Sequence, residues 1–366
     1  MKLKKKIFVL IILYISTLIA FSNNTVGISG NSTNEYYQSC TIFTAKVGEK
    51  VFFGNNEDML MEGTYIWLVP NQVINTSTGP MDIYGTIFFG FDNNEFIGDG
   101  YPQGGMNEKG LCWDGNGLPV TSLNAHPELN ETHPDMHLWY EILWTCDNVE
   151  KVINYFQTHY LGTLIGCQIH FADASGNAVV VSGGPDGELA YTIINGSNFL
   201  ISTNFNLAKP SNGWYPCWRY SIAFEMLSKI NNEYDLTVKA CREVLDAVHV
   251  DYTSYSNIFD LNRRVIYIYQ NHNFDKAVKL NLNKELNKVS FGHPNVKYCN
   301  FSQAILKKCP IENQDRVLVK EIKISALFDI ARFEQRLSII SIKIIEGVAL
   351  IGLSLIINKR RQRHSS

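Results

Sequence analysis

The sequence lacks the spacings that mark several common kinds of functional site. Its eight cysteines include no Cys-x-x-Cys pair and no Cys/His spacing typical of a metal site. The formal net charge of -3 is near balance, so composition gives no reason to expect a nucleic-acid partner. There is no internal repeat and no low-complexity tract. What remains is a chain of 366 residues, 45 % hydrophobic, which suits one large globular domain or two small ones.

The first residues have the pattern of a targeting segment. Four lysines lie within residues 2–6 and precede an apolar run over 7–21, which is typical of a secretory signal spanning residues 1–22. Because the small-residue cleavage motif is weak, an uncleaved anchor is the alternative. Residues 23–39 are polar and rich in Asn and Ser, as in a propeptide or linker.

Six Asn-x-Ser/Thr sequons fit an exported glycoprotein, although an Asn-rich sequence also produces them by chance. The sequons begin at Asn23, Asn31, Asn75, Asn130, Asn195 and Asn300.

The last residues also suggest a membrane anchor. Residues 337–357 are long enough to span a bilayer as a helix, and the basic tail 358–366 follows as in a stop-transfer segment. Lys343 and Glu346 lie inside this run, so an amphipathic helix packed on the domain is the alternative. Residues 286–336 are polar and weakly periodic, as in an extension joining the domain to the last helix. We expect an exported chain on the extracellular face of the membrane.

The middle of the chain predicts strands, then helices, then strands, which indicates an α+β layered fold. A hairpin is expected from strand 40–46, a turn at Gly48-Glu49 and strand 50–54. Further strands are expected at 65–70, 84–90, 110–114, 166–173, 177–182, 189–194, 198–203, 264–269 and 278–282. Helices are expected at 134–145, 148–158, 216–231 and 236–248, the last of them capped by Asp235.

The hairpin carries the residues with the clearest chemistry. Cys40 begins its first strand, and a thiol needs a base because it is mostly protonated near neutral pH. The α-amine of an N-terminal residue has a pKa of about 7.7–8.0 and can serve as that base on its own residue. The Ser39-Cys40 bond would then be cut, autocatalytically by the same thiol. Asp58 ends the partner strand, so β-pairing returns it toward Cys40 to orient the amine.

Five segments in order resemble the penicillin V acylase and bile-salt (choloylglycine) hydrolase family and its acyl-coenzyme A:6-aminopenicillanic acid acyltransferase relatives, which are N-terminal-nucleophile hydrolases. The segments are Cys40-Thr41, Phe53-Gly54-Asn55-Asn56-Glu57-Asp58, Gly105-Met106-Asn107-Glu108-Lys109-Gly110-Leu111, Ser202-Thr203-Asn204 and Pro216-Cys217-Trp218-Arg219-Tyr220. The resemblance covers residues 40–285. Asn55 departs from it, since the family has an arginine there. This departure loosens the link to bile salts and penicillin V and favours the acyltransferase-like branch.

The resemblance implies an αββα four-layer sandwich and a set of roles. By this resemblance, the nucleophile is Cys40, the amine-orienting carboxylate is Asp58, the oxyanion amide is Asn204, and the arginine supporting the nucleophile is Arg219. Asn116 is the expected second oxyanion group, from a segment where the register slips by one residue. Trp214 and Trp218 either line an acyl pocket or belong to the core.

The implied reaction is hydrolysis of a linear carbon–nitrogen amide in a small N-acyl substrate through a Cys40 acyl-enzyme, with no metal or organic cofactor. One alternative is acyl transfer to an amine acceptor. Another is a catalytically inactive, membrane-tethered binding protein on the same sandwich. The sequence leaves the oligomeric state open.

Simpler structural roles compete with each functional one. Taken alone, Cys40 is a small buried hydrophobe, Asp58 a strand-end turn residue, Asn204 a turn cap and Arg219 an ion-pair partner. A papain-like pair of Cys40 with His170 is a further alternative, although the local papain signature is missing. Cys299 and Cys309 are close enough in sequence to form a disulfide.

Overall fold

The computed structural model describes residues 40–59, 64–91, 101–134, 136–287 and 297–300. The expected signal segment, the propeptide, most of the C-terminal extension, the 337–357 helix, the basic tail and Cys309 lie outside these residues. In the part that is described, no helix is long and apolar enough to cross a membrane.

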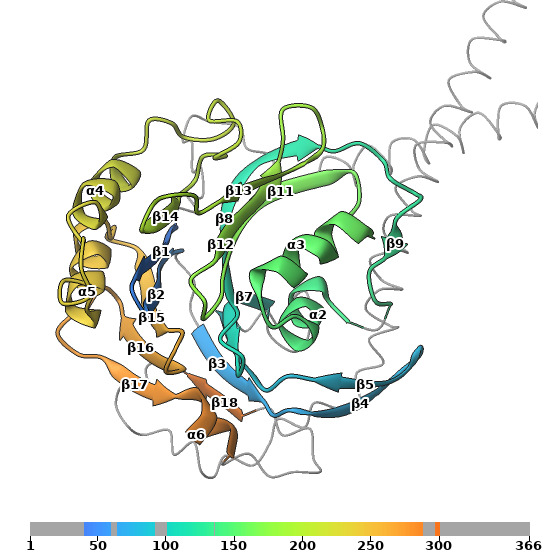
Figure 1. Cartoon of the computed structure of the whole chain (residues 1–366), viewed down its shortest axis with the longest axis horizontal. Helices are drawn as coiled ribbons and strands as arrows, with labels where there is room; N and C mark the ends of the chain where they lie inside the picture. Colours follow the sequence, from blue (N-terminus) through green and yellow to red (C-terminus); the bar gives the residue numbers. More distant parts are fainter. Residues whose placement is uncertain (1–39, 60–63, 92–100, 135, 288–296, 301–366) are drawn as a thin grey trace, which may run out of the picture. The chain divides into compact units, whose positions relative to one another are not determined.

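The first sheet is antiparallel, with the strand order β14-β1-β2-β15-β16-β17 (Figure 1). Its strands are β1 (Thr41–Val47), β2 (Lys50–Asp58), β14 (Phe199–Ser202), β15 (Thr253–Asp260), β16 (Val265–Gln270) and β17 (Val278–Asn281). The predicted hairpin is present as β1 and β2, and its turn contains Gly48 at φ +57°, a left-handed conformation that favours glycine. β2 continues beyond the predicted residue 54 to Asp58.

The second sheet is also antiparallel, with the order β13-β12-β11-β8-β7-β6-β3-β18. Its strands are β3 (Thr64–Val69), β6 (Thr86–Phe91), β7 (Tyr101–Asn107), β8 (Cys112–Ser122), β11 (Leu164–Ala172), β12 (Ala178–Gly183), β13 (Leu189–Ile193) and β18 (Lys297–Asn300). β18 pairs with β3, so a piece of the 286–336 segment contributes to this sheet. Two small sheets accompany it: β4 (Gln72–Thr76) with β5 (Gly79–Ile83), and β9 (Asn130–Glu131) with β10 (His159–Tyr160).

Helices cover the outer face of each sheet. α2 (Leu138–Thr145) and α3 (Val149–Thr158) pack on the second sheet, where Leu143 and Phe156 share a core with Phe171. α4 (Trp218–Leu227) and α5 (Val238–Ala247) pack on the first sheet, where Leu227 and Leu245 share a core with Phe43 (Figure 1). A short helix, α6 (Leu282–Asn287), follows β17.

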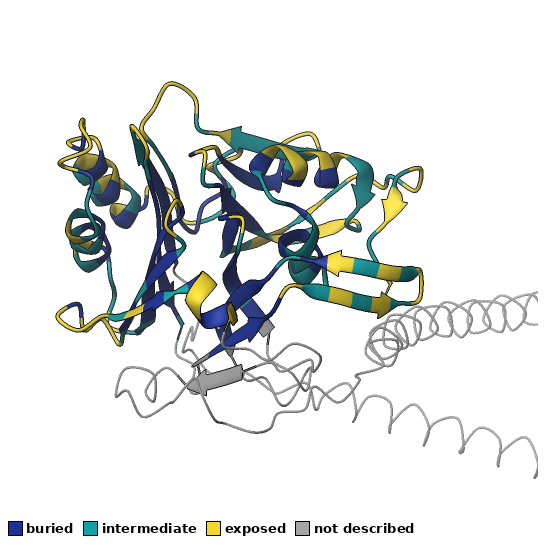
Figure 2. Cartoon of the chain, turned by 60° about the horizontal axis from the view of Figure 1, so that its bottom comes forward, coloured by how far each residue is buried: buried dark blue, intermediate teal, exposed yellow. Residues whose placement is uncertain are grey.

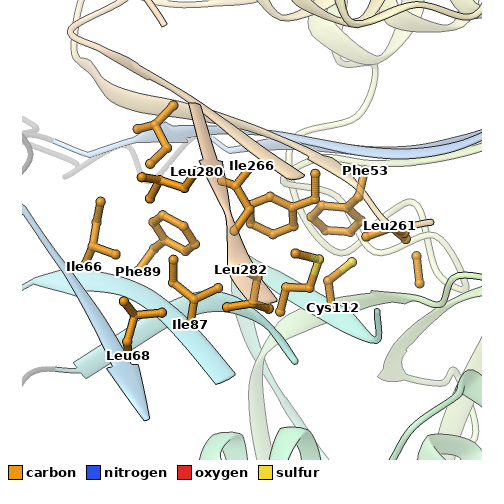
Figure 3. Close-up of a cluster of buried hydrophobic side chains, with 14 of the residues drawn as sticks. Phe53, Ile66, Leu68, Ile87, Phe89, Cys112, Leu261, Ile266, Leu280 and Leu282 are labelled. Carbon is orange, nitrogen blue, oxygen red and sulfur yellow. The ribbon is translucent and has the colours of Figure 1, made fainter. Parts of the chain in front are cut away.

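The inner core lies between the two sheets. Successive side chains of a strand point to opposite faces, so Ile42 and Phe53 enter this inner core while Phe43 and Phe52 pack under α4 and α5. Figure 2 shows the central strands of the two large sheets mostly buried, while the outward helix faces and the β4–β5 hairpin are partly exposed. The inner side chains labelled in Figure 3 are Phe53, Ile66, Leu68, Ile87, Phe89, Cys112, Leu261, Ile266, Leu280 and Leu282. This arrangement is the predicted αββα sandwich.

The capping prediction for α5 is wrong. The N-cap is Thr237, whose side chain accepts the Ala240 N–H, while Asp235 accepts a hydrogen bond from Asn232 in the preceding turn. The sequence also missed β15, since its polar Ser256 and Asn257 hide the apolar run that would indicate a buried strand.

Candidate active site

Cys40 lies immediately before β1 and is buried, with 3 % of its surface exposed. Thr41 pairs with Asn56 across the hairpin, and this register puts Cys40 beside Glu57. The Cys40 Sγ donates to Glu57 Oε1 at 3.6 Å and accepts a hydrogen bond from the Asp58 backbone N–H. The hairpin therefore fixes the thiol through both residues at the end of β2.

Arg219 holds the backbone of Cys40 from the helix side. Its Nη1 donates to the Cys40 carbonyl oxygen at 2.7 Å and to Thr41 Oγ1 at 2.9 Å, and its Nη2 donates to Asn204 Oδ1 at 2.9 Å. A cation in the first turn of a helix opposes the helix dipole, and α4 has no side-chain cap. The buried Asp58 carboxylate offsets this, with Oδ2 lying 3.7 Å from Nη1.

Asp58 faces the helix layer and not the inner core. Its Oδ1 accepts from Thr253 Oγ1 at the start of β15, and its Oδ2 faces Arg219. The side chain is fully buried. Asp58 is thus a fixed charge that anchors Arg219 close to Cys40.

The two expected oxyanion amides both reach the site. Asn116 Nδ2 donates to the Cys40 carbonyl oxygen at 3.2 Å, and its Oδ1 has no hydrogen-bond partner among the described residues. Asn204 Nδ2 donates to the Gly117 carbonyl oxygen at 3.0 Å, while its Oδ1 accepts from Arg219. An amide nitrogen carries two hydrogens, so each Nδ2 has one left for a substrate oxygen.

Two further carboxyl groups lie on the inner side of the hairpin. Glu57 and Asp114 are both buried, and Asn55 Nδ2 donates to Asp114 Oδ2 at 2.7 Å. Burial, and then the charge of Asp58, raises the pKa of Glu57 to about 8, against hydrogen bonds with Cys40 and Asn55 that lower it. Burial, then Glu57, raises the pKa of Asp114 well above its usual range. The arginine expected by family resemblance at position 55 would place a positive charge beside this pair, whereas Asn55 is neutral.

The same carboxyl groups act on the thiol. The pKa of Cys40 is raised well above its usual value, first by burial and then by the charges of Glu57, Asp58 and Asp114. The thiol is therefore protonated near neutral pH and needs a base in order to attack.

The sequence analysis also singled out Trp214, Trp218 and His170. Trp214 and Trp218 are 46 % and 53 % exposed, so they do not belong to the core, and the Trp214 N–H donates to the Asn204 carbonyl oxygen. His170 bonds to Thr44 and Ser202 and is not paired with Cys40, which excludes the papain-like arrangement. Burial lowers the pKa of His170 to about 3.

Sequence reasoning missed three residues of the site: Glu57, Asp114 and Thr253. A carboxylic acid two residues beyond Asn55 on a buried strand was a usable signal, because it must share the face of Asn55. Nothing local marks Thr253 or Asp114. Among the described residues, no group of three or more His, Cys, Asp and Glu side chains is placed to hold a metal ion.

No family model matches the sequence, and no curated protein matches it. Among solved structures, a variant of the conjugated bile acid hydrolase from Clostridium perfringens aligns with a TM-score of 0.54 at 17 % identity, over 72 % of this chain and 97 % of that one. Penicillin V acylase from Agrobacterium tumefaciens aligns with a TM-score of 0.44 at 15 % identity, over 72 % and 86 %. The Caenorhabditis elegans ortholog of N-acylethanolamine-hydrolyzing acid amidase aligns with a TM-score of 0.41 at 14 % identity, over 61 % and 93 %.

The first of these likenesses, together with two antiparallel sheets between helical layers, establishes the architecture. The chain has the αββα fold of the N-terminal-nucleophile hydrolases.

Proposed function

We propose that this chain is an amidohydrolase that cleaves a linear carbon–nitrogen amide bond through a thioester on Cys40. The observation that carries the proposal is the convergence of Arg219 and Asn116 on the Cys40 carbonyl oxygen, with Glu57 and Asp58 on its Sγ. A buried structural cysteine does not need four polar groups directed at it.

The proposed reaction begins when the Cys40 α-amine takes the Sγ proton and sulfur attacks the substrate carbonyl carbon. The free Nδ2 hydrogens of Asn204 and Asn116 stabilise the oxyanion. The leaving amine departs with the proton from the α-ammonium, and the thioester remains. Water, deprotonated by the same α-amine, then attacks the thioester, and the carboxylic acid leaves as the thiol is restored.

This mechanism requires that residues up to Ser39 be removed, because the α-amine exists only once the Ser39-Cys40 bond is cut. The substrate class that we propose is a small N-acyl amide. Two exposed aromatic side chains, Trp214 and Trp218, flank the Asn204 and Arg219 segments in the chain and supply apolar surface for an acyl group.

The test is the N-terminus and activity of the purified protein. We expect mass spectrometry to find Cys40 first, and Cys40→Ala to abolish both the cut and hydrolysis of a panel of N-acyl aminocoumarin amides. The matched control is Cys146→Ala, another buried free thiol at the end of α2. An active enzyme with an intact Ser39-Cys40 bond would contradict the proposed mechanism. Unchanged ligand binding in Cys40→Ala, with no turnover by either protein, identifies a binding protein instead.

Adding acceptor amines to the assay separates hydrolysis from acyl transfer. We expect free acid as the product, and an acylated acceptor that replaces it would assign the transferase reaction.

We also propose that the chain is exported to the extracellular face of a membrane. The supporting observations are the basic and apolar pattern of residues 2–21, the basic tail after residues 337–357, and exposed sequon asparagines at Asn75, Asn130 and Asn195. Extraction that depends on detergent, and is lost on truncation after Arg336, tests the anchor.

A further inference from the structure

Before the chain is cut, Cys40 has no α-amine. Its nitrogen is part of the Ser39-Cys40 peptide bond and has no basic lone pair. The thiol is nevertheless the group that has to attack the Ser39 carbonyl if the cut is autocatalytic. The uncut chain therefore needs a different base for the first turnover of its own nucleophile.

Glu57 is the group placed to do this. Its Oε1 accepts a hydrogen bond from the Cys40 thiol, with 3.6 Å between Oε1 and Sγ. Its Oε2 has no hydrogen-bond partner among the described residues, and only 1 % of the residue is exposed. The Asp58 carboxylate faces Arg219 and accepts from Thr253, and it is the Asp58 backbone N–H that contacts Sγ. His170 is engaged by Thr44 and Ser202.

The surroundings of Glu57 make it a stronger base than an ordinary carboxylate. Asp58 follows it on β2, Cys40 faces it from the residue before β1, Asp114 faces it from β8, and Tyr255 lies opposite it on β15. Among these, no group is a cation. Burial and the neighbouring charge of Asp58 raise the pKa of Glu57 to about 8, and a base works best when its pKa lies near the working pH.

We propose that Glu57 is the catalytic base for the self-cleavage of the Ser39-Cys40 bond, an inference that rests on the proposed N-terminal-nucleophile function. Glu57 takes the Sγ proton as sulfur bonds to the Ser39 carbonyl carbon. The carbon–nitrogen bond then breaks, and the Cys40 nitrogen takes the proton back from Glu57 to become an amine. Water hydrolyses the resulting Ser39 thioester, and the Ser39 carboxylate and the Cys40 thiol are released.

Two different bases therefore act in turn. Glu57 acts once, on the uncut chain, and the new α-amine acts in every later turnover. A variant that loses Glu57 should therefore fail to cut itself and still become competent if another protease makes the same cut.

The experiment uses the full chain with Glu57→Gln and follows self-cleavage by intact mass between pH 6 and 9. We expect the wild-type rate to rise with pH through about 8, because only the carboxylate accepts a proton. Glu57→Gln should slow the cut by at least about 10²-fold and remove this pH dependence, since a positioned base contributes roughly 10²–10⁴-fold. Glu141→Gln, a buried glutamate of α2 that bonds to Tyr155, is the matched control and should cut at the wild-type rate.

A second variant tests whether Glu57 is needed only before the chain is cut. Residues 36–39 are replaced by Ile-Glu-Gly-Arg, so that factor Xa exposes Cys40 in chains with and without Glu57→Gln. The readouts are hydrolysis of the aminocoumarin amides and the rate at which iodoacetamide alkylates Cys40. We expect the cut Glu57→Gln chain to regain amide hydrolysis and to be alkylated at least as fast as the cut wild-type chain, because the charge of Glu57 raises the pKa of Cys40. Hydrolysis by this chain also shows that Glu57→Gln folds.

Three results overturn the proposal. The first is a Glu57→Gln chain that cuts itself at the wild-type rate, and the second is a wild-type chain that never cuts itself. The third is a Glu57→Gln chain that stays unreactive after factor Xa has cut it. None of them removes the amidohydrolase proposal if the factor Xa-cut wild-type chain hydrolyses the probe amides. Glu57→Asp keeps a carboxylate and should retain measurable, pH-dependent cutting.

Discussion

Glu57 Oε1 lies 3.6 Å from the Sγ of Cys40, on the neighbouring strand of the same hairpin. The next residue, Asp58, points to the opposite face of the sheet, where it lies 3.7 Å from Arg219. Two successive carboxyl groups thus act on one cysteine from two sides of a strand. One contacts the thiol, and the other holds the arginine that binds the cysteine backbone.

Arg219→Ala should destabilise the fold strongly. It removes hydrogen bonds to Cys40, Thr41 and Asn204 and leaves the Asp58 carboxylate buried without its cation. Breaking such a buried pair costs about 3–5 kcal/mol. Urea denaturation in a Cys40→Ala background, where both chains stay uncut, measures this.

The control is Arg242→Ala on α5, whose guanidinium makes longer contacts with Glu243 and Asp246 near the surface. It should cost less than about 1 kcal/mol. Equal losses for the two arginines would contradict the central position given to Arg219.

Asn204→Ala should lower kcat on the probe amides by about 10²–10³-fold, the usual effect of losing one oxyanion donor. The Asn204 Nδ2 donates one of its two hydrogens to the Gly117 carbonyl oxygen, so the other can bond to the oxyanion. Asn212→Ala, a half-buried asparagine that bonds to Thr121, is the matched control and should leave kcat within about twofold. If KM rises and kcat stays, Asn204 acts on ground-state binding instead.

Asn55→Arg should shift the pH midpoint of self-cleavage downward by about 1–3 units. An opposite charge within a few ångströms favours the ionised carboxylate, so the pKa of Glu57 falls from about 8. Asn55→Gln, which keeps a neutral donor, should leave the midpoint within half a unit or so of wild type. An unmoved midpoint in Asn55→Arg would show that some other group sets the profile.

His170 should make the fold sensitive to acid. Its pKa is lowered by burial from 6.5 to about 3, so the unfolded chain binds the proton first as pH falls. Stability is therefore full above about 6.5 and is lost as pH falls toward 3, by about 3 kcal/mol at pH 4.

Denaturation at pH 7 and pH 4 measures this loss, and His170→Gln should lose less stability than wild type between these two values. The exposed His272→Gln should follow wild type.

Glycosylation should be visible at three surface positions if the chain is exported. Asn75, Asn130 and Asn195 are exposed on strands or turns and are accessible to a transferase. Expression in a glycosylating host should add mass that an N-glycosidase removes, and each Asn→Gln change should remove one increment. The same chain without residues 2–21 should gain none, and an unmodified full-length chain would count against export.

The local parts of this protein were predictable. The β1–β2 hairpin and its glycine turn follow from alternation and turn residues within one short segment, although β2 runs to Asp58, past the predicted end at residue 54. Most helices and strands were also predicted, with shifted ends. β15 and β7 escaped because polar or glycine-rich residues facing buried neighbours do not produce an apolar alternation.

The sequence by itself determined the hairpin, the cysteine at its start and the alternation that separates Glu57 from Asp58. Only the tertiary structure decided which of the two carboxyl groups meets the thiol, because this depends on strand register and on which sheet face is covered by helices. The same holds for Arg219, which reaches the Cys40 carbonyl from 179 residues away. Asp114, brought beside Asn55 by the packing of one sheet on the other, is a third case. Contacts between distant segments depend on how whole layers pack, and no local pattern encodes them.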